Sequence, residues 1–218
     1  MWIMNMNPLS QFFLDLVMPV NCFVCAKPGV FLCPGCGARL WPAPPSVQPH
    51  VHALFNYKDK RVQNILWQYK YVRKKVLAEV LAKSLAENPA IFSVLKKTEV
   101  LVPVPTTKKG ARLRGFDQTR VLAQELSAIL PHLSIADFNV LVKNKKSKEQ
   151  TKTKNRKERW KNASLSFVVA NSESIMEKHL ALIDDVTTTG ATLHYARLAL
   201  LENGAKTVHS IAVARHGR

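Results

Sequence analysis

The segment ALIDDVTTTGATL, residues 181–193, decides the fold of this chain. An apolar run ends in two acids, Asp184 and Asp185, and a hydroxyl-rich loop with one glycine, Gly190, leads into a stretch with helical spacing. A buried strand followed by a short loop and a helix is typical of α/β proteins with a parallel sheet. The segment therefore predicts an α/β fold with a mainly parallel sheet, in which ligands bind beyond the carboxyl ends of the strands.

The loop between this strand and helix carries groups that suit a phosphate. A helix N-terminus presents unpaired N–H groups and the positive end of the helix dipole, and a glycine allows close approach of the backbone. We expect the phosphate contacts to come from Thr187, Thr188, Thr189, Gly190, Ala191 and Thr192. The two acids would then lie a sugar length away, where they could accept hydrogen bonds from ribose hydroxyls. The loop therefore predicts a site for a phosphorylated ribose.

The acids and the threonines have two other interpretations. Paired acids at a strand end also occur in P-loop ATPases, which require G-x4-G-K-[ST], but no glycine of this chain is followed by lysine and then serine or threonine. The threonines could instead form a plain helix cap, which leaves two adjacent acids at the end of an apolar strand without a role. The ribose phosphate site explains both features.

Short apolar runs alternate with amphipathic stretches from residue 50 onward. We expect further strands at 51–57, 100–104 and 208–214, and helices within 61–87 and at 119–130 and 191–202. Prolines at 42, 44, 45 and 49 favour a linker before this body. The sequence therefore predicts two domains, residues 1–45 with a short helix and a cysteine module, and residues 46–218.

The cysteines lie close together, in the pattern C-x2-C, seven residues, C-x2-C. They are Cys22, Cys25, Cys33 and Cys36. Two such turns can direct four thiolates to one zinc ion, and because no position stays open the site would be structural. We expect Gly35 and Gly37 to supply positive φ angles there. Two disulfides or a redox pair are the alternatives, disfavoured by a reducing compartment and by the lack of a surrounding βαβ pattern.

The chain is strongly basic, with a formal net charge of +17 over 218 residues. Such a field attracts polyanions such as nucleic acid or phosphorylated metabolites, whereas excess lysine for solubility is the simpler alternative. No apolar run approaches the ~18 residues that a membrane span needs. No Lys or Arg precedes Lys27, so the sequence does not favour a secretory signal. We therefore expect a cytoplasmic protein without a transmembrane segment.

Two basic stretches predict a surface for nucleic acid. Residues 143–161 contain ten basic residues against two acids, which is +8 of the +17, and residues 58–75 contain seven against one. The second stretch also holds Trp67, Tyr69 and Tyr71, and single-strand binders combine cations with aromatic rings. Tyr69 falls on the apolar face, where core packing is the common explanation. The candidate DNA-binding residues are Lys70, Lys145, Lys146, Lys148, Lys152, Lys154, Arg156 and Arg159.

Residues 181–193 resemble the motif with which type I phosphoribosyltransferases bind phosphoribosyl pyrophosphate (PRPP). The whole chain resembles the ComF family of competence-associated proteins, in which a short zinc module precedes such a domain. The residues that carry the resemblance are the four cysteines, Tyr57, Lys70, the runs PVP at 103–105 and RGFDQ at 114–118, and Gln150, Arg156, Arg159, Asn162 and Phe167. The family usually has asparagine where this chain has Asp117.

The resemblance implies a PRPP site that uses Mg²⁺, with Asp184 and Asp185 as its catalytic acids. It implies a pyrophosphate-binding loop at 105–114, with Lys108, Arg112 and Arg114 as cations, and a lid at 143–161. It also implies single-stranded DNA and proteins of the DNA-uptake machinery as partners. Two functions stay open, a PRPP-binding protein that handles single-stranded DNA and a phosphoribosyltransferase that acts on a small acceptor, because the sequence shows no hood that would read a base.

Overall fold

The computed structural model describes residues 21–71, 74–106, 115–137, 139–143 and 167–217. The chain forms two compact units, Met1–Leu40 and Trp41–Arg218. The first unit contains the four cysteines, and the second contains the sheet and its helices.

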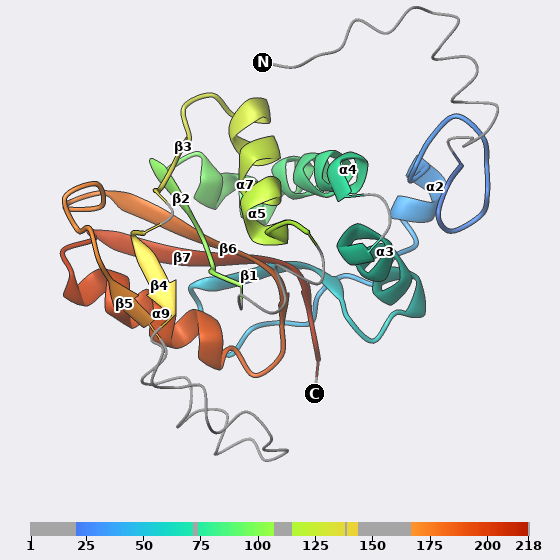
Figure 1. The fold of residues 1–218 in the computed structure, drawn as a ribbon. Coiled ribbons are helices and arrows are strands. Elements are labelled where there is room, and N and C mark those ends of the chain that lie inside the picture. The colour runs from blue at the N-terminus through green and yellow to red at the C-terminus, as the bar shows by residue number, and fades with distance from the viewer. Residues whose placement is uncertain (1–20, 72–73, 107–114, 138, 144–166, 218) are drawn as a thin grey trace, which may run out of the picture. The chain divides into compact units, whose positions relative to one another are not determined.

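The second unit is built on a five-stranded sheet (Figure 1). Its strands are β1 (Val51–Asn56), β2 (Val100–Pro103), β3 (Ser134–Ile135), β6 (His179–Thr187) and β7 (Thr207–Arg215). They lie in the order β1-β7-β6-β2-β3, and every neighbouring pair is parallel. The predicted α/β fold with a mainly parallel sheet is confirmed.

Helices cover both faces of this sheet. They are α3 (Lys60–Tyr71), α4 (Lys74–Glu87), α5 (Pro89–Leu95), α7 (Gln118–Ile129) and α9 (Ala191–Glu202). In Figure 1, α4, α5 and α7 lie over one face. The other face carries α9 and a small antiparallel hairpin of β4 (Leu141–Lys143) and β5 (Phe167–Val169). Among the described residues, no helix is long and apolar enough to cross a membrane.

The central strand β6 is apolar along its length because both of its faces are buried. Leu180 and Leu182 pack with Leu193 of α9 in one cluster. Ala181 and Ile183 point to the opposite face, since side chains alternate along a strand, and they are buried as well. A strand covered on two sides reads as a continuous apolar run, which is the pattern that identified it in the sequence.

The predicted elements occur near their expected positions, with some differences. The helical region 61–87 is divided into α3 and α4, and α9 begins and ends at the predicted residues. The sequence analysis missed α5 and the β4–β5 hairpin. The start of α5 carries a recognisable signal, because Asn88 precedes Pro89 and its side chain accepts a hydrogen bond from the Ile91 N–H at 3.1 Å.

Residues 41–43 belong to the second unit even though prolines follow. The Trp41 carbonyl accepts a hydrogen bond from the Asn56 N–H at 2.8 Å, and the Ala43 N–H donates to the Leu54 carbonyl at 3.1 Å. Pro42 lies opposite Phe55 in this pairing. Because β1 is an edge strand, a neighbour that lacks an N–H group is tolerated there.

In the first unit, residues 21–40 fold into two turns around the cysteines. The second turn contains the short helix α2 (Pro34–Gly37). Gly35 and Gly37 lie within this helix without positive φ, so that expectation is wrong. Positive φ occurs instead at Ala26 (58°) and Gly29 (83°), in the loop between the two cysteine pairs.

Candidate functional site

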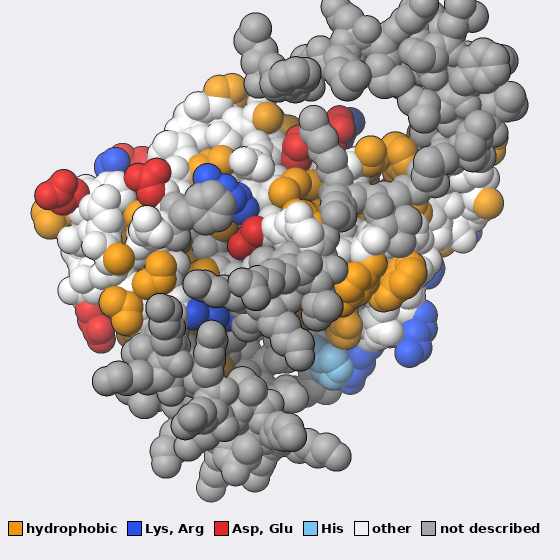
Figure 2. Space-filling model, in the orientation of Figure 1, with side chains coloured by type: hydrophobic (Ala, Val, Ile, Leu, Met, Phe, Trp, Pro, Cys, Tyr) orange, Lys and Arg blue, Asp and Glu red, His pale blue; other side chains and the backbone are white. Residues whose placement is uncertain are grey.

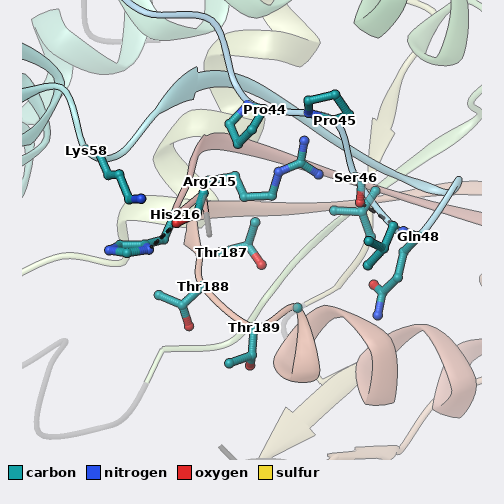
Figure 3. Close-up of a pocket in the computed structure, with 14 residues that line it drawn as sticks. Pro44, Pro45, Ser46, Gln48, Lys58, Thr187, Thr188, Thr189, Arg215 and His216 are labelled. Atoms are coloured by element: carbon teal, nitrogen blue, oxygen red, sulfur yellow. Dashed lines mark hydrogen bonds between the residues drawn. The ribbon is translucent and has the colours of Figure 1, made fainter.

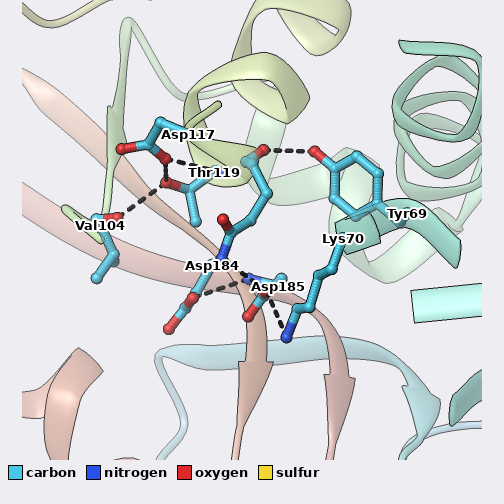
Figure 4. Close-up of polar contacts among 8 residues, drawn as sticks. Tyr69, Lys70, Val104, Asp117, Thr119, Asp184 and Asp185 are labelled. Carbon is cyan, nitrogen blue, oxygen red and sulfur yellow. Dashed lines mark hydrogen bonds and ion pairs between the residues drawn. The ribbon is translucent and has the colours of Figure 1, made fainter. Parts of the chain in front are cut away.

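The acids at the end of β6 lie at the carboxyl edge of the sheet. Asp185 is buried, and its Oδ2 atom lies 2.8 Å from the Lys70 ammonium of α3 and accepts a hydrogen bond from the Gln118 side chain of α7 at 3.0 Å (Figure 4). A buried carboxylate without partners is costly, whereas one with a cation and an amide donor is satisfied. Asp185 is therefore fixed by two helices that cross over the strand ends.

The partners of Asp185 are themselves held in place. Tyr69, which is fully buried, donates a hydrogen bond from its hydroxyl to the Gln118 carbonyl (Figure 4). Asp117 caps α7 and accepts hydrogen bonds from the Thr119 and Arg120 N–H groups at 3.2 and 3.4 Å. Aspartate and asparagine are about equally good at this position of a helix. Asp117 therefore caps α7 as an asparagine at this position would.

Asp184 has a different environment from its neighbour. One of its carboxylate oxygens accepts a hydrogen bond from the Asp185 N–H at 2.8 Å, and its side chain points away from that of Asp185 (Figure 4). Burial raises the pKa of Asp184 well above its usual range, and the Asp185 carboxylate adds to this rise, while Lys143 and Lys70 act in the opposite direction. Asp185 thus already has a cation and an amide donor as partners, whereas the charged form of Asp184 would be stabilised by a bound cation or hydroxyl donor.

The loop after β6 borders a cavity of about 630 Å³ (Figure 3). Its described lining comes from residues 44–48, Val51, Lys58, residues 187–190 and residues 215–217. Lys58, Arg215 and His216 are basic, and no described lining residue is acidic. The Nε and Nη1 atoms of Arg215 are buried and have no hydrogen-bond partner among the described residues. Such a cavity can bind an anion.

Gly190 is the last residue of this loop and directly precedes α9. It is the N-cap of α9 with φ of +78°, a left-handed conformation that side chains with a Cβ rarely adopt. A Cβ at this position would also lie 3.1 Å from the Oε1 atom of Gln48. Because glycine offers no capping side chain, the first turn of α9 relies on the Thr189 hydroxyl, which accepts from the Ala191 N–H at 3.3 Å, and on any anion that binds there.

The four cysteines form a compact cluster. Their Sγ atoms all lie within 4.8 Å of one another, and those of Cys25 and Cys33 are 3.7 Å apart. A tetrahedral ion bound by thiolates at about 2.3 Å needs sulfur atoms about 3.8 Å apart. All four are free thiols, and the Cys33 N–H points at the Cys22 sulfur at 3.5 Å. The cluster can hold a tetrahedral metal ion such as zinc.

Comparisons with known proteins agree with this geometry. A model of the phosphoribosyl transferase domain matches residues 117–218. Competence protein ComFC of Bacillus subtilis is 35% identical over 141 residues, which cover 63% of this chain and 54% of the relative. Competence protein F of Haemophilus influenzae is 28% identical over 155 residues, covering 71% and 66%. DNA utilization protein YhgH of Salmonella typhimurium is 27% identical over 210 residues, covering 89% of both chains.

The chain belongs to the ComF family. The matched part spans only about half to two thirds of the first two relatives, 54% and 66% of their lengths. The match to the phosphoribosyl transferase domain lies within the second unit and includes α7, β6, α9 and β7.

The structure places some of the predicted ComF site residues and not others. Asp184, Asp185 and residues 187–192 lie together at the carboxyl edge. The candidate pyrophosphate ligands Lys108, Arg112 and Arg114 lie outside the described residues, as do seven of the candidate DNA contacts, Lys145, Lys146, Lys148, Lys152, Lys154, Arg156 and Arg159. Lys70 is described, and its ammonium is paired with Asp185.

Sequence reasoning did not find Gln48, Lys58, Gln118 or Arg215 as parts of this region. Lys58 and Arg215 could have been found, because each lies at the end of a predicted strand, where the carboxyl edge of a parallel sheet gathers its ligands. Gln48 and Gln118 reach the site from a proline-rich segment and from a helix start, and only tertiary structure reveals their partners.

Replacing Gly190 with alanine should lower the free energy of unfolding of the second unit by about 1–2 kcal/mol, because alanine is strained at this φ angle. Gly204→Ala is a matched control, since Gly204 (φ +91°) follows the far end of the same helix. Urea unfolding should show similar losses for both variants, whereas calorimetric titration with ribose 5-phosphate should show weaker binding for Gly190→Ala alone. Equal ligand affinity in the two variants would contradict a role of this loop in phosphate binding.

Proposed function

We propose that this ComF-family protein binds PRPP at the carboxyl edge of its sheet and handles single-stranded DNA during DNA uptake. The observation that carries the first part is the acid pair Asp184–Asp185 at the end of β6, directly before the glycine-capped helix α9. Carboxylates a short loop away from a helix N-terminus could accept hydrogen bonds from ribose hydroxyls while the helix N-terminus holds a 5′-phosphate. The phosphoribosyl transferase domain that matches residues 117–218 supports this assignment.

Different residues of the site would contact different parts of the ligand. The N–H groups at the start of α9 and the hydroxyls of Thr188, Thr189 and Thr192 would hold the 5′-phosphate. Asp184 and Asp185 would accept hydrogen bonds from the ribose hydroxyls, and Asp184 lies where it could also contact a hydrated Mg²⁺. When bound, Mg²⁺ supplies charge neutralisation at the pyrophosphate. Lys70 and Gln118 hold Asp185 in one orientation.

The DNA part of the proposal rests on relatives and on charge. The relatives carry the names competence protein and DNA utilization protein. The chain has a net charge of +17, of which +8 lies in residues 143–161. Lys143 is the one residue of that stretch that the structure describes, and it pairs with Phe167 in the β4–β5 hairpin. This density of positive charge in the sequence suits contacts with a phosphate backbone.

Replacing Asp184 and Asp185 with asparagine should weaken the binding of Mg²⁺–PRPP by about 2 kcal/mol or more, because the amides are poorer acceptors and carry no charge. Isothermal titration calorimetry measures this loss. Glu173→Gln with Glu202→Gln removes the same charge from exposed positions away from the acid pair and should leave the affinity unchanged.

The pH dependence provides a second measurement of the same variant. Since the folded pKa of Asp184 is raised, its carboxylate is lost at a higher pH than usual, and PRPP affinity should rise as the pH increases toward and above that pKa. This rise should be smaller in the double asparagine variant. If a folded double variant kept wild-type affinity and the same pH profile, the acid pair would have no part in PRPP binding.

Replacing Lys145, Lys146, Lys148, Lys152 and Lys154 with glutamine should weaken single-stranded DNA binding for every sequence tested. Phosphate contacts release counterions, so log affinity falls linearly with log salt, and this slope should flatten in the variant. Fluorescence anisotropy of labelled oligonucleotides over a salt series measures both quantities.

The control for net charge changes Lys83, Lys96, Lys97, Lys178 and Lys206 to glutamine, five lysines elsewhere on the second unit. We expect this control to keep most of the affinity and a slope close to that of the wild type. Equal effects of the two sets would show that bulk charge, and not residues 143–161, governs binding, and a wild-type protein without affinity at low salt would refute the DNA part.

A second candidate function is a phosphoribosyltransferase that acts on a small acceptor. It is favoured by the cavity, whose described lining includes the first residue of β1 and the last residues of β6 and β7 but no residue of β2. If pyrophosphate binds to the loop after β2, an acceptor must approach the ribose from the opposite side, where this cavity lies. Its basic lining fits an anionic acceptor. Release of pyrophosphate from Mg²⁺–PRPP on addition of an anionic heterocycle would favour this candidate over binding without turnover.

We also propose that the cysteine cluster of the first unit holds one structural zinc ion. The fit rests on the sulfur distances and on the free thiols. With four thiolates, zinc would supply folding free energy to a unit whose described part is small, and it would have no open position for catalysis.

Elemental analysis of purified protein should find about one zinc per chain. Cys33→Ser should release the metal and unfold the first unit, because metal binding and folding are coupled in small modules. A Cys33→His variant tests the ligand role, since histidine also binds zinc and should retain part of the metal. Protein free of metal, with the same proteolysis pattern in wild type and Cys33→Ser, would contradict the proposal.

A further inference from the structure

Helix α3 has one face in the core and one face in solvent. The buried face consists of Val62, Ile65, Leu66 and Tyr69. The exposed residues are Lys60, Asn64, Trp67 and Tyr71, which follow one another at spacings of four, three and four and therefore lie along one side of the helix. The aromatic residues of this stretch thus separate into a buried Tyr69 and an exposed pair.

Trp67 and Tyr71 are the two large aromatic side chains on the exposed side. They are 56% and 53% exposed, and their ring centroids lie 5.9 Å apart with an angle of 46° between the planes. An exposed residue with a large aromatic ring is uncommon, because burial of such a ring is worth more than that of other side chains. Two of them in adjacent turns form a ready surface for a flat, apolar partner.

Helix α3 and the turn before it carry exposed positive charge and no exposed acid. Asp59 is the one acid between residues 58 and 75, and it is 4% exposed and ion-paired with Arg61 at 2.7 Å. Lys58 and Lys60 are exposed. Figure 2 shows hydrophobic side chains gathered beside Lys and Arg side chains over the part of the molecule where α3 lies in Figure 1. A flat partner that also carries negative charge is therefore favoured over an apolar protein surface.

We infer that Trp67 and Tyr71 form a platform on which bases of a single-stranded nucleic acid stack. The inference rests on the DNA binding proposed above and adds the place where bases are held. Lys60, on the same exposed side of the helix, attracts the phosphates of a strand that runs along α3, and rings accept any base because every base has a π face. Charge favours this partner, since the same side of the helix carries Lys60 and no acid.

The test compares Trp67→Ala and Tyr71→Ala with Phe92→Ala, which removes an exposed aromatic ring (41% exposed) from α5. Loss of one stacked base lowers affinity for oligo(dT) by about 5- to 150-fold, and Phe92→Ala keeps wild-type affinity. The slope of log affinity against log salt stays unchanged in both platform variants, because they remove no phosphate contact. Trp67→Phe retains a ring and recovers part of the affinity.

A second arm uses an abasic oligonucleotide of the same length, which has the phosphates but no bases. Wild-type protein binds it more weakly than oligo(dT), and the difference shrinks in Trp67→Ala. In a background with Trp2, Trp41 and Trp160 changed to phenylalanine, oligo(dT) quenches the fluorescence of Trp67 and protects it from acrylamide.

The possible results distinguish a failure of the aromatic platform from a failure of DNA binding as a whole. Equal affinity for oligo(dT) and the abasic strand, or platform variants that match Phe92→Ala, overturn the platform while DNA binding stands. A Trp67 already shielded from acrylamide before DNA is added also overturns it. Absence of binding to either strand at low salt overturns the proposed DNA function together with the platform.

Discussion

The contact on which the site depends is the ion pair between Asp185 and Lys70. Asp185 is buried at the end of the central strand, where an isolated carboxylate would lose far more hydration energy than a single hydrogen bond returns. The Lys70 ammonium at 2.8 Å and the Gln118 amide at 3.0 Å satisfy it. Removing one partner would leave a buried charge, so α3 and α7 are tied to the strand that carries the ligand-binding loop.

Asp184, next to the paired Asp185, has a raised pKa. Partial burial disfavours the charged form of Asp184, and the negative charge of Asp185 one residue away adds to this effect. A ligand that brings Mg²⁺ or hydroxyl donors relieves that cost. Asp184 lies directly before the loop and the glycine-capped helix, so this preference agrees with the phosphorylated ribose and metal proposed for the site.

Much of this arrangement could be read from the sequence, because the segments concerned follow strong local rules. The run 181–193 has apolar residues for a strand covered on two faces, then a glycine required by positive φ, and then a helix. The cysteine spacing likewise predicted a cluster of four sulfurs. Lys70 was different, because its sequence context suggests a surface cation whereas the fold turns it toward Asp185. Pairings between helices that are far apart in sequence leave no periodic signal, and the same is true of Gln118.

Helix α3 links the two activities proposed for the second unit. Its buried face anchors it to the core, and Lys70 is paired with Asp185. Trp67 and Tyr71, three residues before and one residue after Lys70, are exposed. A ligand that brings Mg²⁺ to the acids competes with the Lys70 ammonium for the charge of Asp185, and a polyanion on the outer face competes for the lysines of the same helix. If the two ligands change each other's affinity, thermodynamic linkage requires the factor to be equal in both directions. The short path through one helix makes α3 the element on which such coupling would act.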